Sequence, residues 1–169
     1  MAFARSRTST ATPASWCRAR LTHKSFEGLR GALAKLPHRA VIDGEIVVLD
    51  GDGRPRFYDL LRRRGEPVFY AFDLLSLDGR DLCDHPLVER KRILEDVVRG
   101  QARILYARHH DGRGRELFRL VCEQDLEGVV AKLKRGAYGE GWFKIRNPLY
   151  SQYEGRRELF QRKRAASAS

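Results

Sequence analysis

Charged side chains interrupt four short apolar segments of this 169-residue sequence. The segments are AVIDGEIVVL with Asp43 and Glu45, FYAFDLL with Asp73, LEGVVAK with Glu127 and Lys132, and GWFKIR with Lys144 and Arg146. A charge flanked by apolar residues on both sides is costly to bury unless it is paired or used. We therefore treat these residues as candidates for chemistry, and we expect their carboxylates and amines to face a common sheet.

The two-residue period of a β-strand sorts these charges by face. Asp43 and Glu45 fall on one face of their strand, and Lys144 and Arg146 fall on one face of theirs. Carboxylates suit a divalent cation, whereas paired cations suit a phosphate. The pattern predicts a site for a magnesium-nucleotide complex. The competing interpretation is a set of solvated or salt-bridged strand residues.

The elements that must position these segments follow from apolar periodicity. Helical spacing predicts helices over residues 26–36, 57–63, 86–99 and 117–122, and a further short helix over 154–162. Apolar, β-branched runs predict strands over 40–49, 68–75, 104–107, 127–132 and 142–145. Helices and strands alternate irregularly, so we expect an α/β (α+β) fold with mixed, largely antiparallel sheets flanked by helices.

Length and charge favour one compact domain with two polar ends. We expect residues 1–20 to be poorly ordered, residues 21–149 to form the domain, and residues 150–169 to form a helix and basic tail. The net charge of +11 lies mainly at the ends, so charge alone is weak evidence for a nucleic-acid partner. Short apolar runs and three widely spaced cysteines favour a cytoplasmic protein without membrane contact.

The four segments together resemble a known set of motifs. DGEIVV, FYAFDLL, EGVVAK and WFKIR, in this order, resemble motifs III, IIIa, IV and V of covalent nucleotidyltransferases, particularly bacterial ATP-dependent DNA ligases. The flanking text is also similar, from about Lys24 to Lys163. The resemblance implies a partial, ATP-grasp-like adenylation domain. It also implies ATP and Mg²⁺ or Mn²⁺ as cofactors, nicked double-stranded DNA as partner, and a role in DNA repair and recombination.

The resemblance further implies a role for individual residues. Glu45 matches the carboxylate near the ribose and the reaction centre, and Phe72 matches the aromatic residue that stacks on adenine. Glu127 matches the metal-organising carboxylate, with Glu45 as a second metal candidate. Arg146 stands where ligases more often have lysine, and its planar fork differs in geometry from an ammonium group. The residues that the resemblance assigns to ATP are Glu45, Phe72, Lys132, Lys144 and Arg146.

One part of the family pattern does not occur in the sequence. The family reaction needs a lysine in a K-x-D-G motif, whose amine attacks the α-phosphate of ATP. Lys24 is followed by Ser-Phe-Glu-Gly and does not match this motif. Residues 147–169 are too few for the OB-fold domain that ligases add after the fifth motif. We therefore expect no catalytic residue in this chain and no ligation by the chain alone.

Two other functions stay open from the sequence. One is an RNA ligase or a capping-type nucleotidyltransferase, which shares the motifs but fits the flanking text less well. The other is a non-catalytic basic module of ligase ancestry that binds nucleic acid or a partner. Covalent labelling by α-labelled ATP would distinguish an active nucleotidyltransferase from such a module.

Overall fold

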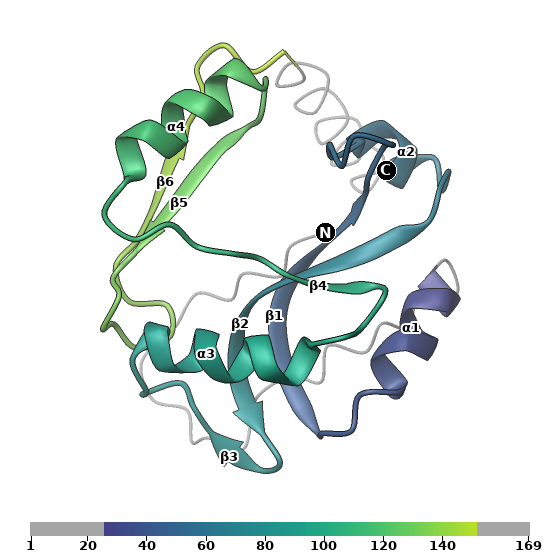
Figure 1. Cartoon of the computed structure of the whole chain (residues 1–169), viewed down its shortest axis with the longest axis vertical. Coiled ribbons are helices and arrows are strands. Elements are labelled where there is room, and N and C mark those ends of the chain that lie inside the picture. Colours follow the sequence, from purple (N-terminus) through teal and green to yellow (C-terminus); the bar gives the residue numbers. More distant parts are fainter. Residues whose placement is uncertain (1–25, 152–169) are drawn as a thin grey trace, which may run out of the picture. The chain divides into compact units, whose positions relative to one another are not determined.

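The computed structural model describes residues 26–151, and the helix expected over 154–162 lies outside them, as do residues 1–20 (Figure 1). The described residues divide into two compact units. The first comprises residues 26–108 and 134–140, and the second comprises residues 109–133 and 141–151. Each unit has its own sheet, so each is described by itself.

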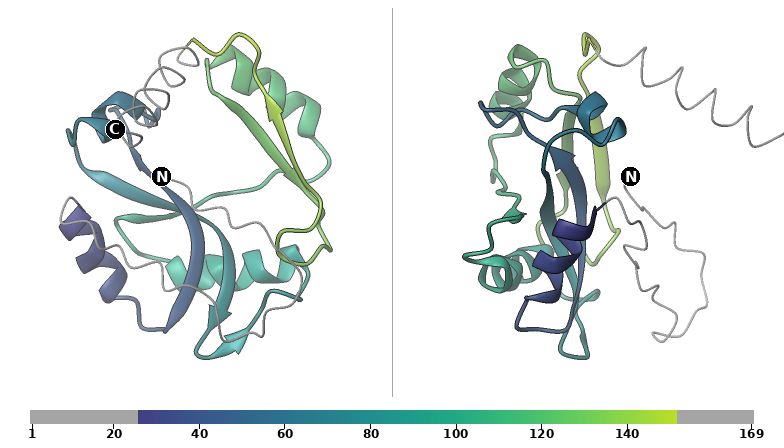
Figure 2. Two further views of the ribbon diagram at one scale, coloured as in Figure 1. Left: turned by 180° about the vertical axis from the view of Figure 1, so that it is seen from behind. Right: turned by 90° about the vertical axis from the view of Figure 1, so that its right-hand side faces the viewer.

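The first unit is built on a four-stranded sheet. Its strands are β1 (Ala40–Val48), β2 (Pro67–Leu77), β3 (Arg80–Asp81) and β4 (Ile104–Tyr106). β2 pairs antiparallel with β1 and β3, and it pairs in parallel with β4. β1 and β2 run side by side along their whole length, as Figure 2 shows. The largely antiparallel pairing agrees with the expectation from the sequence.

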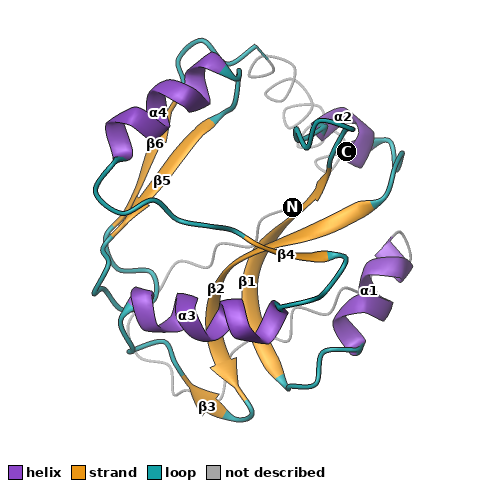
Figure 3. Ribbon diagram, in the orientation of Figure 1, coloured by secondary structure: helices purple, strands orange, loops and turns teal. Residues whose placement is uncertain are grey.

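Three helices accompany this sheet: α1 (Glu27–Ala34), α2 (Phe57–Leu61) and α3 (Leu87–Val98) (Figure 3). α3 follows Pro86 and ends at Val98, because Arg99 is extended with a ψ of 134°. Gly100, with a φ of 75°, lies in the turn that follows, in which the N–H of Gln101 donates to the oxygen of Val98 at 3.3 Å. Its apolar side packs on β2 and β4 and forms the core of this unit with them. The buried core residues are Ala71, Leu74, Leu82, Leu94, Val97, Val98 and Ile104.

The second unit is a helix packed on a β-hairpin. α4 (Gly114–Glu123) contacts β5 (Gly128–Lys132), which pairs antiparallel with β6 (Trp142–Arg146). Val121 is the buried residue of α4, while Phe143 on β6 remains 60% exposed. A two-stranded sheet buries little apolar surface, so this unit has a smaller core than the first.

The sequence predicted every helix and strand of residues 26–151 except β3, with ends shifted by a few residues. The expectation that the four charged segments face a common sheet is wrong. β1 and β2 belong to one sheet, and β5 and β6 form another. Apolar periodicity shows that a segment is a strand, but it does not show which strand pairs with it. Within the described part of the chain, no helix is long and apolar enough to cross a membrane.

Candidate functional site

Glu45 follows a position on β1 that has room only for glycine. A Cβ atom at Gly44 would lie 2.4 Å from Cζ of Phe69 and 2.5 Å from the backbone oxygen of Tyr70. Gly44 therefore allows β2 to approach β1 closely. Glu45 is exposed and lies directly opposite Tyr70. Its carboxylate can thus be reached by a ligand from solution.

Phe72 lies at a β-bulge in β2. Asp73 lies opposite Asp43 on β1. The next pair is Ala71 with Gly44, so the register skips Phe72. A bulge bends its strand and redirects the side chain of the extra residue, and bulges are common beside active sites. Phe72 is half-buried, and this environment is compatible with stacking on a ligand and with core packing.

Asp73, by contrast, forms a structural ion pair with Arg90 of α3. Nε of Arg90 donates to one carboxylate oxygen at 2.8 Å and Nη2 donates to the other at 3.1 Å. Both side chains are 0% exposed. Nη1 of Arg90 donates to the backbone oxygens of His85 and Gly136. This charge on β2 therefore fixes α3 to the sheet and does not face solvent.

Asp43 is also engaged within the protein. The hydroxyl of Tyr138 donates to Oδ2 of Asp43 at 2.7 Å. Tyr138 is held in the first unit because its backbone N–H donates to the oxygen of Cys83 at 2.7 Å and its ring lies 5.9 Å from Cζ of Arg90. Burial, together with the hydrogen bond to Asp43, raises the pKa of the Tyr138 phenol. The hydroxyl thus remains a donor at neutral pH.

Three cations share one face of the β5-β6 hairpin. Directly opposed residues of an antiparallel pair point to the same face. The opposed pairs on this face are Lys132 with Trp142, Val130 with Lys144, and Gly128 with Arg146. Lys144 and Arg146 are exposed, and Lys132 is half-buried. The exposed ammonium of Lys144 and guanidinium of Arg146 can bind the oxygens of a phosphate chain, whereas Nζ of Lys132 is itself buried.

Trp142 has a role on this face that the sequence did not reveal. Nζ of Lys132 lies 3.7 Å from the centroid of the Trp142 ring, a cation-π contact. Trp142 is half-buried. Lys132 is the last residue of β5 and Trp142 is the first residue of β6. Their equal sequence separation from the connecting loop was the signal that could have placed them opposite each other.

Glu127 immediately precedes β5, and two neighbours fix its place. A Cβ atom at Gly128 would lie 2.2 Å from the backbone oxygen of Ile145, and the φ of Gly128 is 147°. The backbone N–H of Asn147 donates to the oxygen of Glu127 at 2.8 Å, and its side chain donates to the oxygen of Leu126 at 3.0 Å. Asn147 is only 6% exposed. No pattern in the sequence predicts these hydrogen bonds between the start of β5 and the end of β6.

The structure thus brings Lys132, Lys144 and Arg146 together in the second unit and places Glu45 and Phe72 in the first. Among residues 26–151, no group of three or more His, Cys, Asp or Glu side chains could hold a metal ion by itself. Mg²⁺ commonly binds through one or two carboxylates plus the phosphates of its nucleotide. The carboxylates of Glu45 and Glu127, which belong to no such group of three, fit that mode and do not fit a metal cage made of protein alone.

Comparison with known families matches these features to one group of proteins. The profile of the ATP dependent DNA ligase domain matches residues 5–147. A probable DNA ligase of Streptomyces coelicolor is 32% identical over 148 residues, with 75% of this chain and 29% of the relative covered. The multifunctional non-homologous end joining protein LigD of Mycolicibacterium smegmatis is 38% identical over 121 residues, with 70% of this chain and 16% of the relative covered.

Solved structures give the same result. The ligase domain of LigD from M. tuberculosis superposes with a TM-score of 0.61 at 32% identity, covering 72% of this chain and 43% of that one. A mycobacterial DNA ligase D complexed with ATP and MES gives a TM-score of 0.60 at 31% identity, covering 73% and 42%. The chain therefore spans less than half the length of each of these proteins.

Proposed function

Because this chain belongs to the ATP-dependent DNA ligase family, we propose that residues 21–149 form part of an adenylation domain and bind ATP. The observation that carries the proposal is the cationic face of the β5-β6 hairpin, on which Lys132, Lys144 and Arg146 point the same way. An exposed pair of cations on an ordered strand is suited to a polyanion, and the neighbouring Lys132 adds a third charge.

Each residue has a distinct part in this proposal. Lys144 contacts the α-phosphate as a compact charge, and the fork of Arg146 binds phosphate oxygens in a bidentate manner. Lys132, positioned by the Trp142 ring, adds a third positive charge. In the first unit, Glu45 accepts hydrogen bonds from the ribose and Phe72 stacks on adenine. The exposure of Glu45 and the bulge at Phe72 support these roles.

We propose that Mg²⁺ or Mn²⁺ enters with the nucleotide and is held by Glu127 of the second unit, and Glu45 of the first unit is a separate candidate carboxylate for the cation. The cation would neutralise phosphate charge when bound. Gly128 and Asn147 keep the backbone of Glu127 at the start of β5, as their contacts require. These two residues thus act on the metal site through the position of Glu127.

The covalent step of the family is not part of the proposed activity of this chain. In that step a lysine amine forms a bond to the α-phosphorus of ATP while the bond to pyrophosphate breaks and the amine loses a proton. The sequence contains no K-x-D-G motif. We expect no protein-bound radioactivity after incubation with α-labelled ATP and magnesium. A covalent label would show that another residue of the chain acts as the nucleophile.

The proposal is tested by thermal unfolding with and without ATP and magnesium. A ligand that binds only the folded state raises the unfolding temperature as its concentration exceeds the dissociation constant. We expect stabilisation by ATP with magnesium, and a smaller effect in Phe72→Leu, which keeps apolar bulk but removes the aromatic face. Leu149→Ala, at an 87% exposed position, is the matched control. Absence of stabilisation at millimolar ATP would refute nucleotide binding.

A second proposed ligand is nicked double-stranded DNA, bound weakly through the same exposed cations. The observation that favours it is the exposure of Lys144 and Arg146 on one strand face. Phosphate contacts release counterions, so affinity should fall steeply with salt. Competition between ATP and nicked DNA in a fluorescence anisotropy titration would show that the two ligands share this face. Equal DNA affinity in Lys144→Ala and the parent would contradict it.

A further inference from the structure

Lys91 is a buried cation that the proposed nucleotide contacts do not use. It lies in α3 and is only 6% exposed. Burying an ammonium group is costly unless other groups replace its hydration. Here Nζ donates to the backbone oxygen of Ala107 at 2.8 Å and to that of Phe72 at 3.4 Å. Two backbone carbonyls from separate segments of the chain thus meet at one lysine.

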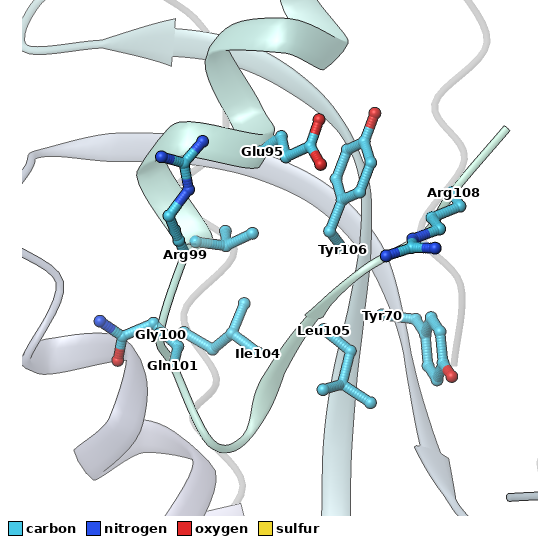
Figure 4. A pocket seen from close by; sticks show the side chains of 10 residues that line it. Tyr70, Glu95, Arg99, Gly100, Gln101, Ile104, Leu105, Tyr106 and Arg108 are labelled. Carbon is cyan, nitrogen blue, oxygen red and sulfur yellow. The ribbon is translucent and has the colours of Figure 1, made fainter.

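An aromatic ring completes the surroundings of this ammonium group. Nζ of Lys91 lies 4.6 Å from the centroid of the Tyr106 ring, within the range of a cation-π contact. Tyr106 lines a hollow of about 570 Å³, and Glu95 of α3 lies beside it (Figure 4). Lys91 does not line this hollow. The ammonium group is therefore held inside the fold and is not offered to a ligand in solution.

The two carbonyls that Lys91 binds lie just beyond the regular pairing of β2. β2 pairs with β4 up to Ala71, which is opposite Tyr106. Phe72 and Ala107 are the next residues of the two segments. On the other side of β2, the register with β1 skips Phe72. The two ladders therefore do not by themselves fix the backbone of Phe72, and Lys91 binds this backbone where regular pairing stops.

Two consecutive residues of α3 hold two consecutive residues of β2. Arg90 donates to both carboxylate oxygens of Asp73, and Lys91 donates to the carbonyl of Phe72. Both cations are buried, at 0% and 6% exposure. Hydrogen bonds to charged groups are stronger than those between neutral groups. The side of the bulge that faces α3 is thus constrained by two charge-assisted contacts, and the one at Phe72 comes from Lys91.

We propose that Lys91 is a positioning residue, which sets the conformation of the bulge at Phe72 and so presents the Phe72 ring to the adenine base. The role depends on the proposed stacking of adenine on Phe72. Lys91 makes no contact with the nucleotide and acts through the carbonyl of Phe72. A ring that is already fixed in its bound conformation loses less freedom on binding, so its affinity for the base is higher. Loss of Lys91 weakens the contact with adenine and leaves the contacts with phosphate unchanged.

Calorimetric titrations of the full chain separate base contacts from phosphate contacts. The ligands are ATP and inorganic tripolyphosphate, each with magnesium. We expect Lys91→Met, which keeps the length of the side chain without the ammonium group, to bind ATP about fivefold or more weakly, in the range of one stacked base, and to bind tripolyphosphate as the parent does. Arg92→Met, at an exposed position of the same helix, should match the parent with both ligands. Unchanged ATP affinity in Lys91→Met, or an equal loss for both ligands, would overturn the proposal.

The proton signals of adenine give a readout that a change in stability alone does not move. A base stacked on an aromatic ring feels the ring current, which shifts its H2 and H8 signals upfield. We expect this shift in the parent, its loss in Phe72→Leu, and a smaller shift in Lys91→Met. Adding Lys91→Met to Phe72→Leu should lower ATP affinity no further, because both changes remove the same contact. Additive losses would show that Lys91 acts elsewhere and would overturn the proposal.

Two more substitutions keep the test decisive if Lys91→Met does not fold. Lys91→Arg retains a cationic donor and should keep most of the adenine shift, whereas the shorter, neutral amide of Lys91→Gln should not. Equal shifts in these two variants would overturn the role of Lys91 alone, provided that the parent binds ATP. No ATP binding by the parent would refute the nucleotide role of Phe72 and, with it, the role of Lys91.

Discussion

Arg90 and Asp73 form a fully buried pair in which neither charge has access to solvent. Removing one partner from such a pair leaves an uncompensated buried charge, which typically costs about 3–5 kcal/mol. Asp73→Asn should therefore lower the free energy of unfolding by roughly that amount in urea titrations. Asp96→Asn, in the exposed pair with Arg99, should change it by less than about 1 kcal/mol. Similar losses in the two variants would contradict the structural role of Asp73.

Tyr138 and Asp43 give a prediction that depends on pH. The raised pKa of Tyr138 means that the folded state favours the protonated phenol. Its contribution to stability is fully present below the ordinary pKa of 10.0 and is lost as pH rises from there toward the folded value. Tyr138→Phe should lower the free energy of unfolding by about 1.5–3 kcal/mol at neutral pH, because it removes a hydrogen bond to a charged group.

This difference between the parent and Tyr138→Phe should shrink above about pH 10, where the parent loses its proton on unfolding. Urea unfolding of both proteins from about pH 8 to about pH 11 measures it. Cys83, whose pKa burial raises to about 12, titrates in both proteins, so its effect cancels in the comparison. A difference that stayed constant over this range would show that the Tyr138 proton is not linked to folding.

The β5-β6 hairpin depends on a glycine at the start of β5. At Gly128 a side chain would meet the backbone of Ile145 at 2.2 Å and a φ of 147°, which is sparsely populated by other residues. We expect Gly128→Ala to destabilise the chain by more than about 2 kcal/mol and to disturb the amide signals of β5 and β6.

The control is Gly114→Ala at the start of α4, where a Cβ atom meets nothing within 4 Å. This substitution should be neutral or stabilising by up to about 1 kcal/mol, because alanine favours a helix more than glycine does. Both variants are measured by urea unfolding and by amide spectra. Comparable stability of the two variants would mean that β5 and β6 do not approach as closely as the structure has them.

At the scale of elements, apolar periodicity predicted most of the fold, because it reports a local property of the chain. The helix that begins after Pro86 and the strand that contains Glu45 each have a clear period and clear end signals. β3 was missed since its two residues, Arg80 and Asp81, are too few for any period. The pairing of strands into two sheets depends on contacts distant in sequence, which local pattern does not encode.

The same distinction between local pattern and distant contacts applies to the candidate site. Alternation correctly placed Lys144 and Arg146 on one strand face. It could not show that Asp73 is buried against Arg90, because the two are 17 residues apart and belong to different elements. Nor could alternation reveal the cation-π contact of Trp142 or the hydrogen bond of Asn147, because both form only when β5 and β6 pair. The ligand roles of Glu45, Phe72, Glu127, Lys132, Lys144 and Arg146 stay predictions.

For the molecule as a whole, membership of the ligase family and the activity of this chain are separate questions. The family profile spans residues 5–147, so the assignment does not rest on one motif. The chain nevertheless covers only 29% of the Streptomyces coelicolor relative, and ligation by the whole family protein is not transferred to this chain. What the described residues support most directly is a phosphate-binding face in the second unit.

The measurement that tests this account most directly is a calorimetric titration of the full chain with ATP and magnesium, compared with Lys144→Ala. We predict saturable binding by the parent and an affinity roughly tenfold or more lower in Lys144→Ala, because a charge-assisted phosphate contact is lost. Arg115→Ala, which removes an exposed arginine of α4, should bind as the parent does. Equal ATP affinity in the parent and Lys144→Ala, or no binding by the parent, would contradict the nucleotide-binding role of this face.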